Sequence, residues 1–193
     1  MSTTNLIPTF SEDKEGLREM YTWMFENVSS YIRGRTLLAG PGWDLFLPLL
    51  LEQGIPIHLA VNKKEELENF RKQYADNNLF RAFHYLNLSS ILFTSENSEL
   101  QEAFKTIILL KSPKNTSIIK NVAFLLPPLG KLLIQTASFT ASYEGLNLSL
   151  EDWKEIDRKP IKNFLSGFEI QKTRHSILGS QEHYVIIAAY KIA

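Results

Sequence analysis

Cysteine is missing from this chain, and its absence narrows the chemistry that the protein can perform. None of the 193 residues is a cysteine. This excludes disulfide bonds, metal sites built from thiolates and a cysteine nucleophile. A chain without cysteine also fits a reducing compartment, so we expect a cytoplasmic protein.

The chain also lacks a charge imbalance and a long apolar segment. Its 21 basic residues match its 21 acidic residues, which gives a formal net charge of +0. We therefore expect no nucleic-acid partner and no attraction to an acidic membrane surface. The best apolar candidate, Leu45 to Leu51, is interrupted by Pro48 and followed by Glu52, so no membrane span is expected. Residues 1–16 lack the cationic and then apolar pattern of a signal peptide.

The composition present is that of one globular domain covering residues 1–193. Hydrophobic residues make up 44% of the chain and charged residues 22%, which is enough apolar material for one sizeable core. Residues 1–10 are mostly polar or small, and we expect them to be flexible. Residues 11–33 are predicted to form a helix with Ser11 as its N-cap. Its apolar face is made by Leu17, Met20, Tyr21, Met24, Phe25 and Val28.

Apolar strand-like runs alternate with helical patterns along most of the chain. The predicted strands are Arg35 to Ala39, Ile55 to Val61, Phe80 to Leu88, Lys105 to Leu110 and Lys131 to Thr136. The helix after Gly42 contains Pro48, which is tolerated best in the first turn, so we expect this helix to start late. Asn115 or Thr116 is predicted to cap the helix that precedes the fifth strand.

The C-terminal part departs from this alternation. A loop is predicted over residues 137–148, and a helix is predicted to start near Ser149. Phe168 to Leu178 and His183 to Ala193 are two extended runs around a short loop, which predicts an antiparallel hairpin. The fold class is therefore α/β: a Rossmann-like, doubly wound, mostly parallel seven-stranded sheet with helices on both faces and this hairpin at its end.

One turn is the best candidate for a ligand site. Gly40, Pro41 and Gly42 follow the first predicted parallel strand and precede a helix. In doubly wound folds, the backbone amides and the helix N-terminus at this position face a ligand. The alternative is a tight turn with no ligand, in which Asp44 caps the helix and occupies those amides.

Several motifs, in this order, resemble the class I S-adenosylmethionine-dependent methyltransferases. The similar segments are Tyr21-Thr-Trp23, Arg35 to Gly42, Phe104 to Leu110, Leu126 to Ile134 and Ser166 to Ile170. The resemblance covers Leu17 to the C-terminus and implies methyl transfer from S-adenosylmethionine to a small-molecule acceptor. The cofactor-binding residues that it implies are Gly40, Pro41, Gly42, Trp43, Asn62 near the ribose, Asn87 near the adenine, and Lys111 after the fourth strand.

The sequence also departs from the family at acidic positions. Leu38 stands two residues before the first loop glycine, where these enzymes usually carry an acid, and Asp44 replaces the third glycine. Asn62 and Asn87 stand where carboxylates commonly meet the ribose and the adenine. Asn62 has a second interpretation, because with Glu65 it fits an N-cap of its own helix.

Two functions therefore stay open at this point. The first is a divergent methyltransferase, favoured by the glycine turn and the complete architecture. The second is an inactive methyltransferase-like domain that binds a protein partner as a scaffold, favoured by the missing acids. No catalytic residue is assigned, and no metal site is expected. The histidines have no metal-binding spacing, and we interpret all four as structural: His58, His84, His175 and His183.

Overall fold

The computed structural model describes residues 8–74, 76–137, 159–179 and 182–192. Eight strands form one sheet in the order β1-β7-β8-β6-β5-β2-β3-β4. The strands are β1 (Thr9–Phe10), β2 (Thr36–Ala39), β3 (Ile57–Val61), β4 (Phe80–Tyr85), β5 (Thr106–Ser112), β6 (Lys131–Ala137), β7 (Phe168–Leu178) and β8 (Glu182–Lys191). The helices are α1 (Lys14–Val28), α2 (Trp43–Glu52), α3 (Lys64–Tyr74), α4 (Phe93–Glu96) and α5 (Thr116–Leu125), with 3-10 turns η1 (Ser29–Tyr31) and η2 (Ser98–Leu100).

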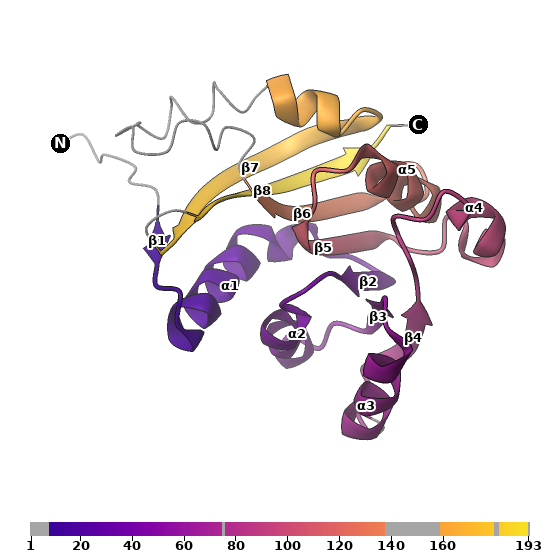
Figure 1. Cartoon of the computed structure of the whole chain (residues 1–193), viewed down its shortest axis with the longest axis horizontal. Helices are drawn as coiled ribbons and strands as arrows, with labels where there is room; N and C mark the ends of the chain where they lie inside the picture. Colours follow the sequence, from indigo (N-terminus) through magenta and orange to yellow (C-terminus); the bar gives the residue numbers. More distant parts are fainter. Residues whose placement is uncertain (1–7, 75, 138–158, 180–181, 193) are drawn as a thin grey trace.

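The centre of the sheet is parallel and covered on both faces. β2 pairs in parallel with both β3 and β5, and all residues of β2 and β3 are buried. Helices α1 and α2 pack on one face, while α5 and α4 pack on the other (Figure 1). Continuous apolar runs are what strands buried on both faces require. The predicted Rossmann-like α/β fold is therefore confirmed.

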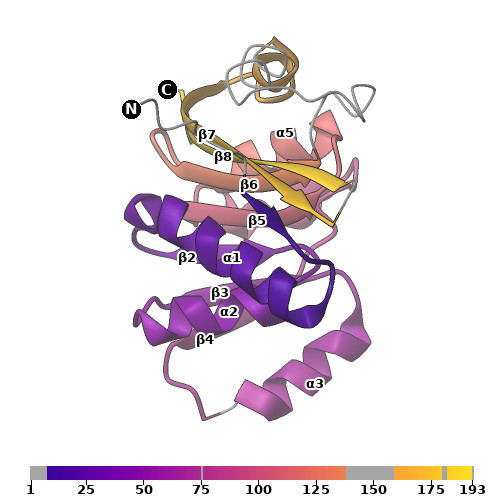
Figure 2. The same ribbon diagram turned by 90° about the vertical axis from the view of Figure 1, so that its left-hand side faces the viewer.

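The predicted C-terminal hairpin is also present. β7 and β8 are antiparallel, and β8 pairs with β6, so the hairpin extends the parallel sheet. An eighth strand, β1, adds to the seven that the sequence predicts: Thr9 pairs in parallel with Ile177 at the end of β7 (Figure 2). No sequence pattern indicates this strand, because a segment of only two paired residues has no periodicity to detect.

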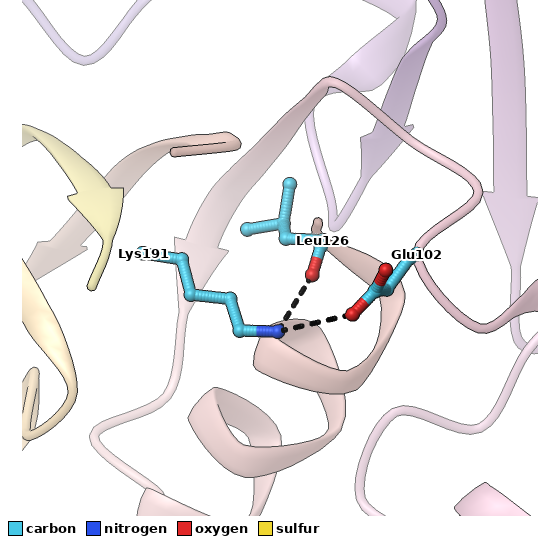
Figure 3. Close-up of polar contacts among 3 residues, drawn as sticks. All are labelled: Glu102, Leu126 and Lys191. Atoms are coloured by element: carbon cyan, nitrogen blue, oxygen red, sulfur yellow. Dashed lines mark hydrogen bonds and ion pairs between the residues drawn. The ribbon is translucent and has the colours of Figure 1, made fainter. Parts of the chain in front are cut away.

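A lysine joins the end of β8 to the end of helix α5. The Lys191 ammonium donates a hydrogen bond of 2.8 Å to the backbone carbonyl of Leu126 and lies 4.0 Å from the Glu102 carboxylate (Figure 3). Leu126 is the C-cap of α5, where a carbonyl lacks an intrahelical partner. A cation there is favourable, so this contact joins the last strand to the helix that covers it.

The start of α1 differs from the prediction by two residues. Asp13, and not Ser11, is the N-cap: its carboxylate accepts a hydrogen bond of 2.8 Å from the backbone N–H of Gly16. The Ser11 hydroxyl donates to the same carboxylate at 2.8 Å. Both residues are good caps, and the choice between them depends on where the preceding chain enters, which local sequence does not fix.

The late start predicted for α2 is wrong. The helix begins at Trp43, directly after Gly42, and Pro48 lies inside it. Pro48 is exposed, and its missing N–H removes one hydrogen bond from the helix. The early start is stabilised by the burial of Phe46, Leu47 and Leu50 against the sheet, which outweighs that loss.

Some predictions lie outside the described residues. The loop over residues 138–148 and the helix start near Ser149 belong to this group. Residues 159–164, which follow, are helical. Within the described ranges, no helix combines the length and the apolar character needed to cross a membrane.

Candidate functional site

A cavity of about 550 Å³ opens where the parallel strands end. It lies beyond the carboxyl ends of β2, β3, β4 and β5, next to the point where the strand order reverses between β2 and β5. Open α/β sheets bind their ligands at such switch points. The cavity is lined by all seven residues that the sequence analysis proposes: Gly40, Pro41, Gly42, Trp43, Asn62, Asn87 and Lys111.

The glycine turn depends on backbone conformations that side chains disfavour. Gly40 has φ of 101° and Gly42 has φ of 87°. A Cβ on Gly40 would overlap the backbone carbonyl of Leu110, and a Cβ on Gly42 would overlap the Tyr21 hydroxyl. Both positions therefore require glycine for the turn itself, whether or not a ligand binds.

The start of α2 has no side-chain cap. Gly42 is the N-cap residue, and its carbonyl accepts bonds of 3.2 Å from Leu45 and 3.3 Å from Phe46. Asp44 is exposed, lies in the first turn of the helix and does not line the cavity. The alternative in which Asp44 caps this helix is therefore wrong. The N-terminus of α2 keeps its positive dipole end at the cavity wall, which favours an anionic group there.

The two asparagines follow neighbouring strands. Asn62 comes directly after β3 and is exposed. Because α3 begins at Lys64, the residue in front of the helix is Lys63 and not Asn62. Asn87 uses its side-chain carbonyl to accept a hydrogen bond of 3.2 Å from the backbone N–H of Ser89. That oxygen has a second lone pair and the amide group has two N–H donors, so Asn87 can still bind a polar ligand group.

Lys111 occupies an irregular position in β5. Its φ is 45°, and the pairing of β5 with β6 shifts register between Leu109 and Ser112. The buried Gln135 side chain accepts a hydrogen bond of 3.4 Å from the Lys111 backbone N–H, in place of a regular strand partner. This bulge turns Lys111 toward the cavity edge. A glutamine within the apolar run of β6 is the only sequence signal for it.

Two charged residues line the cavity among the residues that the structure describes, and both are lysines. Lys63 and Lys111 line it, and no described lining residue carries a carboxylate. The missing acids that the sequence shows are thus not replaced by acids from elsewhere in the described chain. Hydrogen bonds to ribose and adenine groups would come from neutral amides, each worth about 1 kcal/mol net. Lys63 and Ser89 also line the cavity, and no sequence motif indicates them.

Tyr21 and Trp23 do not line the cavity. Tyr21 is buried against Phe46 in the core between α1 and α2, as the apolar stripe predicts. Its hydroxyl has no hydrogen-bond partner, and burial, followed by the charge of Asp44, raises the pKa of Tyr21. The phenol therefore stays neutral under all ordinary conditions.

The histidines lie away from this cavity, and two of them form a pair that no sequence pattern indicates. His58 on β3 and His84 on β4 stack with ring centroids 5.2 Å apart, and their ring nitrogens lie 3.0 Å apart. The Arg35 guanidinium donates to the other nitrogen of His58 at 3.1 Å. Burial, with the charge of Arg35 as its main addition, lowers the pKa of His58 to about 4 and also lowers the pKa of His84.

His58 should make the stability of the protein depend on pH. The pKa of His58 is about 4 in the folded state and about 6.5 in an unfolded chain. The unfolded state therefore binds more protons as the pH falls from 6.5 to 4, and the free energy of unfolding decreases by up to about 1.4 kcal/mol per pH unit. Urea unfolding at pH 7, 6 and 5 measures this loss. His58→Gln, which cannot titrate, should show a shallower decrease, and an equal slope in both proteins would contradict the prediction.

Comparisons with known proteins agree with the sheet topology. The chain matches no family model, and a search of curated proteins finds no match. Among solved structures, it is similar to the N-methyltransferase NodS from Bradyrhizobium japonicum WM9, with a TM-score of 0.64 and 13% identity over 94% of this chain and 99% of that chain. A SAM-dependent methyltransferase from Methanosarcina mazei gives a TM-score of 0.62 and 16% identity over 86% and 97%.

The same fold also occurs in a protein named for another reaction. The [4+2]-cyclase SpnF matches with a TM-score of 0.62 and 14% identity, over 97% of this chain and 87% of that chain. At sequence identities of 13–16%, the similarity to these structures shows the fold of this chain and does not show which reaction it performs. The chain therefore has the fold of the class I S-adenosylmethionine-dependent methyltransferases.

Proposed function

We propose that this protein is a divergent S-adenosylmethionine-dependent methyltransferase that acts on a small-molecule acceptor. The observation that supports this most is the open cavity of about 550 Å³ at the switch point of the sheet. The residues that the family resemblance implies come from four separate segments, at the carboxyl ends of β2, β3, β4 and β5, and all of them line this one space. Side chains of Leu38 and Asp44 do not fill it, because Leu38 is buried in the core and Asp44 points outward to solvent.

The residues present fit the polar groups of an adenosyl amino acid. The uncapped start of α2 after Gly42 would receive the carboxylate, Asn62 would bind the ribose hydroxyls, and Asn87 would bind the adenine edge. When bound, the cofactor supplies a methyl group already activated on a sulfonium. The chain itself needs to hold the acceptor in line and exclude water, for which the apolar wall of Leu86, Leu88 and Ile118 is suited.

A scaffold without cofactor is the second candidate. It is favoured by the lack of carboxylates among the described lining residues, because two lysines leave the sulfonium charge without a counter-charge there. In this case the domain would bind a protein partner and perform no reaction. The two candidates differ in whether the cavity binds the cofactor at all.

Titration calorimetry with S-adenosylmethionine and S-adenosylhomocysteine distinguishes them. We expect both ligands to bind, and at about 100 times the dissociation constant they should stabilise the fold by roughly 2.7 kcal/mol in a thermal unfolding experiment. Asn62→Ala and Asn87→Ala should each weaken binding about three- to tenfold, because each removes one or two neutral hydrogen bonds.

Asn78→Ala is the matched control for these variants. Asn78 is also an exposed asparagine, but it lies in the turn before β4 and does not line the cavity. It should bind both ligands like the parent protein. If millimolar cofactor gives neither heat nor a shift in melting temperature, the methyltransferase proposal is wrong and the scaffold is favoured.

A further inference from the structure

A second cavity, of about 400 Å³, lies at the opposite end of the parallel strands. It is bordered by the segments that lead into β2 and β3 and by side chains near the start of β4. Among the described residues, its lining includes three arginines and no acidic residue: Arg33, Arg35 and Arg81. It shares no lining residue with the first cavity, so nothing in the proposed methyl transfer uses it.

Within the part of the chain that the structure describes, the three guanidinium groups have no acidic partner. Across the described residues, no ion pair or hydrogen bond joins Arg33, Arg35 or Arg81 to a carboxylate. Exposed arginines are usually paired or dispersed, since like charges that gather around one hollow repel each other. An anion in the cavity would relieve this repulsion.

The structure holds the side chain of Arg35 and the backbone of Arg33 in place. The Nε of Arg35 donates to His58 at 3.1 Å, and its guanidinium carbon lies 4.9 Å from the centre of the Phe104 ring. These contacts leave the two terminal NH₂ groups of Arg35 for a ligand. The backbone of Arg33 is bonded in both directions to the buried Thr106 hydroxyl, at 3.0 Å and 2.8 Å. Because the Arg35 guanidinium is already fixed, it loses less entropy when it binds a ligand.

His58, which also lines this cavity, carries no charge at pH 7 and therefore does not change the charge that the arginines give to it. Its Nε2 accepts the hydrogen bond from Arg35, so its proton sits on Nδ1 and is donated to His84. Burial and the charges of Arg35, His84 and Arg81 lower the pKa of His58 to about 4, so the ring is neutral at pH 7. Glu99 acts on His84 in the opposite direction. The net charge lining the cavity therefore comes from the arginines.

We propose that this cavity binds the phosphate group of a small phosphorylated ligand. Guanidinium groups bind phosphate through paired N–H donors in fixed geometry. A phosphate monoester carries about −1.5 to −2 charges at pH 7, which suits three arginines better than a single carboxylate does. The rest of the lining is apolar or small: Ile32, Gly34, Gly54, Ile55 and Pro56. This wall suits a short organic group attached to the phosphate.

The experiment titrates the protein with inorganic phosphate and with phenyl phosphate at constant ionic strength and follows the His58 ring by NMR. Saturable binding below about 10 mM is expected, since ordinary screening by salt does not saturate. The bound anion should raise the pKa of His58, because a nearby negative charge favours the protonated ring. Tighter binding of phenyl phosphate would identify an organic phosphate, and equal binding would identify phosphate itself.

Exposed arginines provide the variants. Arg81→Gln should weaken phosphate binding about tenfold, and the double variant Arg33→Gln/Arg81→Gln should abolish the shift in the His58 pKa. Arg18→Gln, on the exposed face of α1, is the control and should bind like the parent protein. Equal binding by the double variant, no saturation at 10 mM, or sodium benzoate binding as tightly as phenyl phosphate would each overturn the proposal. None of these results depends on S-adenosylmethionine binding.

Discussion

Replacing Gly40 with alanine should destabilise the fold by about 2–5 kcal/mol. The φ of 101° at Gly40 costs an alanine about 1–2 kcal/mol, and the new Cβ would overlap the backbone carbonyl of Leu110. Because a backbone atom cannot rotate away as a side chain can, β2 and β5 would have to move apart, which adds about 1–3 kcal/mol. Urea unfolding monitored by circular dichroism measures the loss.

Gly54→Ala separates the cost of the positive φ from the cost of the overlap with Leu110. Gly54 also has a positive φ, of 68°, but a Cβ there would contact nothing within 4 Å. This variant should lose only about 1 kcal/mol, and the effect of alanine on the unfolded chain is the same at both positions. Equal losses at Gly40 and Gly54 would mean that the approach of the turn to Leu110 contributes nothing to stability.

Phe104→Ala should also destabilise the protein strongly, by about 3–5 kcal/mol. The Phe104 side chain is fully buried, and its ring contacts His58 and His84 edge-on, with centroid distances of 5.4 Å and 5.7 Å. Removing the ring leaves a cavity and also removes the surface on which the Arg35 guanidinium stacks. Denaturant unfolding at pH 7 gives the change in free energy.

A second measurement shows whether the ring also sets the environment of the histidine pair. If water enters the space left by Phe104, the pKa of His58 should rise toward its ordinary value, which NMR detects. Phe93→Ala is the matched control, because Phe93 is equally buried but its ring, on α4, packs on Phe124 of α5. It should lose similar stability and leave His58 unchanged. The same His58 titration in both variants would contradict this role of Phe104.

The parts of the fold that could be predicted are those encoded by local patterns. β7 spans Phe168–Leu178 as predicted, and Asn115 caps α5 through a hydrogen bond of 2.9 Å to the backbone N–H of Ser117. Alternating elements and a closing hairpin are enough to define the topology, because connections in such sheets follow few rules. The candidate site follows from this topology, since its residues all lie at or near the carboxyl ends of parallel strands.

The parts that could not be predicted depend on contacts between distant segments. The pairing of His58 with His84 requires the register of β3 against β4, which shifts between Ile57 and His58. The bulge at Lys111 is stabilised by Gln135, a residue of another strand. The second cavity brings Arg81 next to Arg33 and Arg35, which lie more than 40 positions before it in the sequence. Local periodicity contains no information about such pairings. The positive charge at the amino ends of the parallel strands could therefore not be predicted from a chain whose net charge is zero.

The strand β1 has a consequence for the order in which the chain assembles. Thr9 and Phe10 pair with Ile177 and Leu178, so the first strand finds its partner only near the end of the chain. During synthesis the ribosome releases β1 first, and it must wait until the final hairpin has emerged. Closing so large a loop for two residue pairs is entropically unfavourable until β7 is already docked. Attachment of β1 is therefore expected to be among the last events of folding, and amide hydrogens at this seam should exchange with solvent sooner than those of β2 and β5.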